Sequence, residues 1–146
     1  MTIPLPEKYM RPEGGVGKLA NYQSTQADTL VAGAAIPYGA PVSAVDGVAS
    51  VFTTGDLFGV VIAQEYAKEI PYGDGEKVGE YPKNKPVPVL RKGSIWVKVS
   101  DDVVQNEKAT VNASGFKKAA PEETVVGVFQ STASANGLAI LQINLP

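Results

Sequence analysis

Short apolar segments separated by turn residues make up most of the chain. From Asp28 onward these segments recur at intervals of roughly 8 to 12 residues, with Gly, Pro, Asn or Asp between them. Such spacing is typical of a β-sandwich or β-barrel, because each short strand is followed by a turn. The pattern predicts an all-β domain over residues 28–146, built as a small β-sandwich or β-barrel-like fold.

The clearest pair of strands is expected over residues 87–90 and 94–99. Arg91, Lys92 and Gly93 lie between them, and we expect a hairpin loop there with Gly93 at positive φ. In the second strand three aliphatic residues alternate with Trp96 and Lys98, which predicts one buried face and one outward face. Further strands are predicted over residues 41–43, 48–52, 57–63, 109–112, 125–130 and 138–145.

The first 27 residues differ from the rest in having many helix and strand breakers. Six Pro or Gly residues interrupt this stretch, so no regular element can run far, and we predict an extended N-terminal arm over residues 1–27. Two prolines and two charges fall within residues 1–10, where a secretory signal needs an uninterrupted apolar stretch, so export is not expected. No apolar run approaches the ~20 residues of a membrane-spanning helix.

The chain of 146 residues contains no His and no Cys. This removes the Ser/His/Asp and Cys/His nucleophiles and the zinc sites built on those residues. The adjacent carboxylates Asp101 with Asp102 and Glu122 with Glu123 lie at predicted turns, where they are expected to be solvated rather than to form a glycosidase pair. We therefore expect no enzyme, no cofactor and no metal site.

Charge is distributed unevenly along the chain. The formal net charge of −2 argues against nucleic-acid binding, which depends on neutralising phosphates. Residues 65–80 hold five acids and two bases, a balance of −3, whereas residues 81–100 hold five bases and no acid. The basic segment could steer an acidic partner surface, or it could be the solvated side of a hairpin, and the sequence leaves both open.

Several motifs resemble those of the structural cement, or head-decoration, proteins of tailed bacteriophages. The sequence GKLAN at residues 17–21 ends a Pro/Gly-rich arm, AIPYGAPV at 35–42 introduces the first strands, and LFGVV at 57–61 is similar to a central Phe-Gly-Val strand of the family. The segment PVPVLRKGSIWVKV at 86–99 resembles its Val-Leu-Arg-x-Gly-x-Ile-x-Val hairpin. The likeness extends over most of the chain, including residues 125–145.

The resemblance implies a small all-β virion protein without catalytic groups. Such a protein would be made in the bacterial host cytoplasm and would bind the phage major capsid protein on the outside of the assembled shell. A homo-oligomer is implied as well, with a trimer favoured and a dimer as the alternative. Neither a nucleic acid nor a membrane is expected as a partner.

Two contact regions are hypotheses that follow from this resemblance. The arm could lie along the shell or add a strand to a neighbouring sheet, and the basic hairpin could face acidic capsid loops. Trp96, on the polar side of its strand, could anchor an interface or cover a second core. The candidate contact residues are Pro4, Pro6, Tyr9, Tyr22, Lys83, Lys85, Arg91, Lys92 and Trp96.

The alternative is a carbohydrate-binding β-sandwich module, for example a host-attachment component of a virion. In that interpretation Trp96 and exposed tyrosines such as Tyr66, Tyr72 and Tyr81 would be stacking platforms. Only 8% of the residues are aromatic, so such platforms would be few.

Overall fold

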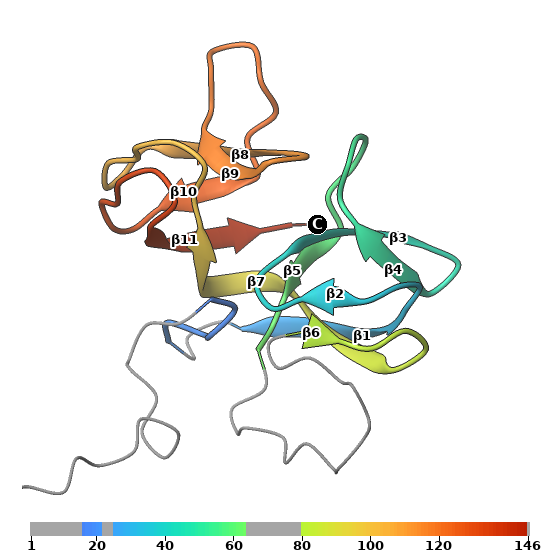
Figure 1. Cartoon of the computed structure of the whole chain (residues 1–146). Coiled ribbons are helices and arrows are strands. Elements are labelled where there is room, and N and C mark those ends of the chain that lie inside the picture. The colour runs from blue at the N-terminus through green and yellow to red at the C-terminus, as the bar shows by residue number, and fades with distance from the viewer. Residues whose placement is uncertain (1–15, 22–24, 64–79, 146) are drawn as a thin grey trace, which may run out of the picture.

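The computed structural model describes residues 16–21, 25–63 and 80–145. Within these ranges it contains strands and no helix, which confirms the predicted all-β fold (Figure 1). The candidate contact residues Pro4, Pro6, Tyr9 and Tyr22 lie outside the described residues. The strands are β1 (Gln26–Ala32), β2 (Ile36–Pro37), β3 (Pro41–Val45), β4 (Val48–Val51), β5 (Gly59–Val61), β6 (Glu80–Tyr81), β7 (Pro86–Lys98), β8 (Lys108–Asn112), β9 (Gly115–Lys118), β10 (Gly127–Phe129) and β11 (Leu138–Asn144).

Nine of these strands form one sheet in the order β1-β4-β3-β5-β7-β11-β10-β8-β9. Because β1 also pairs with β7, the strands β1, β4, β3, β5 and β7 close into a small barrel. We call this barrel, with the short β2–β6 pair, lobe 1. The later residues of β7 and strands β8 to β11 form lobe 2, in which a bridge from Val99 to Phe116 brings β9 back to the end of β7. Figure 1 shows β7 passing from one lobe into the other.

The prediction of a hairpin at residues 87–99 is wrong. Both of the predicted strands belong to the single 13-residue strand β7. Its first half pairs with β1 and β5, and its second half pairs with β11, so each half has partners without turning back on the other. Arg91 is the extra residue of a bulge opposite β1, and Gly93 has the positive φ that the sequence predicted, at 135°. Bulge and glycine together bend the strand between the lobes.

Each lobe has its own hydrophobic core. Val87 and Val89 of β7 face the core of lobe 1, whereas Ile95, Val97 and Val99 face that of lobe 2, which confirms the predicted alternation in the second half. Strand β5 is shared in the same way, because the adjacent Val60 and Val61 belong to different cores. The lobe 1 core consists of Leu30, Ala32, Ile36, Val42, Ala49, Val61, Tyr81, Val87 and Val89. The lobe 2 core consists of Val60, Leu90, Ile95, Val97, Val99, Val103, Ala109, Phe116, Phe129, Ala139, Leu141 and Ile143.

Residues 16–21 lie along the second half of β7. The Gly17 amide donates to the Trp96 carbonyl at 2.8 Å, and the Trp96 amide donates to the Lys18 carbonyl at 2.9 Å. Leu19 packs against the lobe 2 core. This segment is therefore tied to the fold by hydrogen bonds and by the packing of Leu19, and the boundary of the arm at residue 27 stays a prediction.

Candidate functional site

The basic residues singled out in the sequence occupy two separate places. Lys83 and Lys85 are exposed in the turn between β6 and β7, where Asn84 has a φ of 69°. Arg91 and Lys92 lie at the bulge of β7, six residues after Lys85, a separation of roughly 20 Å along an extended strand. The positive charges therefore do not gather at the tip of one hairpin.

Arg91 interacts with two side chains of lobe 1. Its guanidinium carbon lies 4.1 Å from the centre of the Phe58 ring, and its Nε is 4.0 Å from Oδ2 of Asp28. Only 17% of the Arg91 side chain is exposed, whereas Lys92 next to it is exposed. Arg91 thus contributes to the fold, and Lys92 is the more accessible charge at the bulge.

The aromatic residues proposed as glycan platforms differ in exposure. Tyr81 is only 4% exposed, so its interpretation as an exposed stacking platform is wrong. Its hydroxyl donates to the Ile62 carbonyl at 2.5 Å, and its ring meets that of Tyr38 edge-on at 5.1 Å between centroids. Burial, with a smaller contribution from Tyr38, raises the pKa of Tyr81 to about 12. Trp96 is half-buried on the outward side of β7, opposite Ile140, and Tyr66 and Tyr72 lie outside the described residues.

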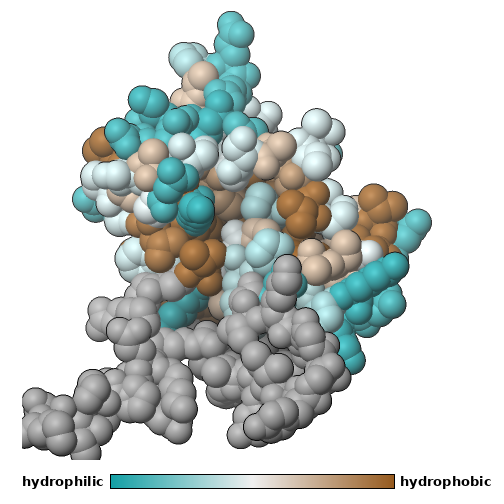
Figure 2. All heavy atoms as spheres, viewed as in Figure 1, coloured by the Kyte–Doolittle hydropathy of each residue, from teal (hydrophilic) through white to brown (hydrophobic). Residues whose placement is uncertain are grey.

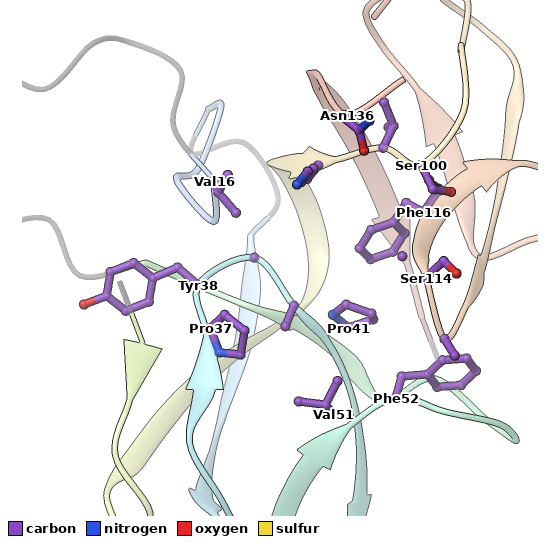
Figure 3. A pocket seen from close by; sticks show the side chains of 16 residues that line it. Val16, Pro37, Tyr38, Pro41, Val51, Phe52, Ser100, Ser114, Phe116 and Asn136 are labelled. Atoms are coloured by element: carbon purple, nitrogen blue, oxygen red, sulfur yellow. Dashed lines mark hydrogen bonds between the residues drawn. The ribbon is translucent and has the colours of Figure 1, made fainter. Parts of the chain in front are cut away.

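An apolar groove of about 360 Å³ runs between the two lobes. Lobe 1 contributes Pro37, Pro41 and Phe52 to its wall, and lobe 2 contributes Phe116. Figure 3 shows these side chains facing one another across the groove, with Val16 and Tyr38 at one end. We call it the inter-lobe groove. No sequence pattern indicated it, because its lining comes from residues between positions 16 and 136 that only the fold brings together.

A second, polar pocket of about 280 Å³ lies at the bend of β7. The Ser94 hydroxyl donates to Oε1 of Gln130 at 2.8 Å, and Nε2 of Gln130 donates to Oε1 of Gln142 at 3.0 Å. Lys92 lines the same pocket. These two hydrogen bonds link β7, the residue after β10 and β11.

The carboxylates considered for catalysis stabilise turns. Oδ1 of Asp102 accepts from the Ala135 amide at 2.8 Å. Oε1 of Glu123 accepts from the Ala120 amide at 3.1 Å, and its Oε2 is 3.4 Å from Nζ of Lys117. Within the described ranges, no group of three or more Asp, Glu, His or Cys side chains is placed to hold a metal ion.

The described part of the chain contains no helix that is long and apolar enough to span a membrane.

Comparison with known proteins identifies a family of virion structural proteins. Residues 6–144 match the family described as structural cement protein (E217 gp24/Pam3 gp6). The match covers nearly the whole chain, so the protein belongs to the phage structural cement family and is a component of the virion.

Among solved structures, the chain is similar to the N base of head fiber gp8.5 in bacteriophage phi29. The two share 17% sequence identity with a TM-score of 0.47, over 82% of this chain and 94% of the other. No curated protein matches the chain.

Proposed function

We propose that this protein binds the outer surface of an assembled phage capsid and cements the shell, without catalysing a reaction. The observation that carries the proposal is membership of the structural cement family over residues 6–144. A protein that binds only the assembled state stabilises that state by mass action, so a non-covalent contact is sufficient. Several subunits clustered on one symmetry axis would add their contacts, which raises the overall avidity.

The partner is the major capsid protein, and the contacts come from two regions. The first is the arm with Pro4, Pro6, Tyr9 and Tyr22, which would lie extended along the shell or add a strand to a neighbouring sheet. The second consists of the remaining candidates, which lie in the β6–β7 turn and around the bulge of β7, namely Lys83, Lys85, Arg91, Lys92 and Trp96. Exposed Lys83 and Lys85 are the better charges for an acidic capsid loop, because Arg91 already interacts with Asp28 and Phe58.

Co-sedimentation with emptied, expanded shells tests the proposal. The protein should pellet with shells at a saturating, fixed ratio to capsid subunits, and it should not bind dissociated subunits. A protein that stays in the supernatant at every shell concentration would contradict the proposal. If it also bound polysaccharide in a glycan pull-down, the carbohydrate-binding alternative would replace the cement function.

Two variants test the two contact regions one at a time, and the first is a deletion in the arm. Deleting residues 1–15 removes most of the arm and keeps residues 16–21, which are bonded to β7. We expect this deletion to abolish shell binding while thermal unfolding stays unchanged.

Reversing the charge of Lys83 and Lys85 together should weaken attachment and flatten its salt dependence. The matched control is the same reversal at Lys108 and Lys118, which are exposed in lobe 2. Equal loss of binding in both double variants would count against a specific contact at the β6–β7 turn.

A further inference from the structure

Three exposed valines lie side by side near the tip of the β3–β4 hairpin. Val48 of β4 pairs with Val45 across the hairpin and with Val31 of β1 on its other side. Their exposed fractions are 69% for Val45, 46% for Val31 and 42% for Val48. We call these residues, with Asp46 in the turn between Val45 and Val48, the hairpin ridge. Figure 2 shows apolar side chains at the surface over this end of the hairpin.

The inter-lobe groove lies at the other end of the same hairpin. Pro41 begins β3 and Val51 ends β4, and both line the groove. The ridge and the groove therefore lie at opposite ends of one hairpin, the first exposed at its tip and the second recessed between the lobes. Both surfaces are mainly apolar.

Each of the two surfaces also carries one exposed charge, and the two charges are opposite. Asp46 is at the tip of the ridge, and Lys98 is in the lining of the groove. Among the described residues, neither side chain forms an ion pair. The ridge and the groove are thus both mainly apolar, and they carry opposite charges.

We propose that the hairpin ridge of one copy inserts into the inter-lobe groove of a second copy, with Asp46 placed beside Lys98. A contact between ridge and ridge would bring two Asp46 carboxylates together, whereas contact between ridge and groove pairs opposite charges. Such a head-to-tail contact uses two different patches on each subunit, and it gives a closed ring when the rotation closes. This inference rests on the clustering of subunits on one symmetry axis in the proposed function, and it favours the trimer over a two-fold dimer.

Light scattering on the free protein tests the contact without any capsid. The wild type should have a mass that is a fixed multiple of the 15.3 kDa chain. Val45→Asp places a charge on the ridge, and Ala113→Arg fills the groove from an exposed turn position. Both variants should be monomeric, whereas Val128→Asp, at an exposed valine of lobe 2, should keep the wild-type mass.

Mixing the two monomeric variants tests the head-to-tail geometry. Val45→Asp retains its groove and Ala113→Arg retains its ridge, so an equimolar mixture should form a one-to-one dimer. If Ala113→Arg kept the wild-type mass, or if the mixture stayed monomeric, the proposal would be overturned.

A double-mutant cycle tests the charge pair. Lys98→Glu should raise the dissociation constant of the contact between two copies about fivefold, because it places a carboxylate beside Asp46. Asp46→Asn, which tolerates the φ of 51° at this position, should weaken association of the wild type and strengthen that of Lys98→Glu. The same effect in both backgrounds would contradict the pair.

The head-to-tail contact and the proposed binding to capsids can fail independently, and the experiments distinguish the two cases. A wild type that is monomeric at all concentrations overturns the head-to-tail contact even if the protein pellets with shells. Loss of shell binding by a monomeric Val45→Asp variant would then assign the ridge to the capsid protein. Thermal unfolding of each variant serves as the check on folding.

Discussion

Two exposed valines, Val48 in lobe 1 and Val128 in lobe 2, have different neighbours. Val128 pairs with Lys108 on one side and Gln142 on the other, so polar groups surround it. Val48 pairs with two further exposed valines and forms the centre of the hairpin ridge. Strand register, rather than residue type, therefore distinguishes an isolated apolar side chain from a candidate interface.

The cores of the two lobes differ as well. Lobe 2 buries the large side chains of Phe116 and Phe129 together with several Leu and Ile residues. Lobe 1 is filled mostly by Val and Ala around Tyr81. Since the free-energy cost of a core truncation rises with the apolar volume removed, lobe 2 should be the more sensitive to it.

The largest expected effect comes from Phe129→Ala in lobe 2. Removing this fully buried ring should lower the free energy of unfolding by about 3 to 5 kcal/mol. Val42→Ala in lobe 1 should cost about 2 kcal/mol, because a smaller cavity is left. Urea denaturation measures both, and equal losses would contradict the difference between the cores.

Gly127→Ala tests how closely the strands approach in lobe 2. A Cβ at Gly127 would overlap the carbonyl oxygen of Gln142 on the neighbouring strand β11, and backbone atoms cannot move aside cheaply. We expect a loss of about 3 kcal/mol in the free energy of unfolding.

The control is Gly47→Ala in the hairpin turn of lobe 1, where a Cβ would meet nothing within 4 Å. Its φ of 80° alone should cost about 1 kcal/mol. A Gly127→Ala variant no less stable than this control would show that β10 and β11 can separate at little cost.

Local pattern was sufficient to predict much of the fold. The alternation at residues 95–99 was predicted from neighbouring residues alone. The same holds for the apolar segments that form β3, β4, β5, β8, β10 and β11. The two-residue strands β2 and β6 carry no periodic signal, and the Arg-Lys-Gly turn signal at 91–93 concealed a continuous strand. What decides between a hairpin and a bent strand is which distant strands pair with each half, and a local pattern does not contain that information.

The same limit applies to the site. The sequence correctly placed Trp96 on the outward side of β7, because that depends on alternation alone. It missed the inter-lobe groove, and it took Tyr81 as exposed although β2 and Tyr38 pack beside it. Burial of an aromatic ring depends on tertiary neighbours that a short window does not contain.

Gly93→Ala should strain the bend of β7 that connects the two lobes. A Cβ there would meet no atom closer than 3.4 Å, so the cost is that of holding Ala at a φ of 135°. We expect a loss of about 2 kcal/mol in the free energy of unfolding. If the shared strand couples the lobes, urea denaturation should still show one transition at a lower midpoint. Two transitions would show that the lobes unfold independently.

A small effect is expected at Tyr81. Tyr81→Phe should cost about 1 kcal/mol at neutral pH, because the hydrogen bond to the Ile62 carbonyl is lost. Since folding raises the pKa of Tyr81 from 10.0 to about 12, its contribution is complete below pH 10 and is lost as the pH rises from 10 through 12. Stability measured against pH should therefore fall less steeply in this window for Tyr81→Phe. Identical slopes would contradict a buried, protonated Tyr81.

We propose above that the protein stabilises an assembled capsid by binding it. The most direct measurement is the temperature at which emptied, expanded shells come apart, recorded while the protein is titrated in. We expect this temperature to rise with protein concentration and to level off at the same ratio at which co-sedimentation saturates. A disassembly temperature that does not change, although the protein is folded and in excess, would contradict a cementing role.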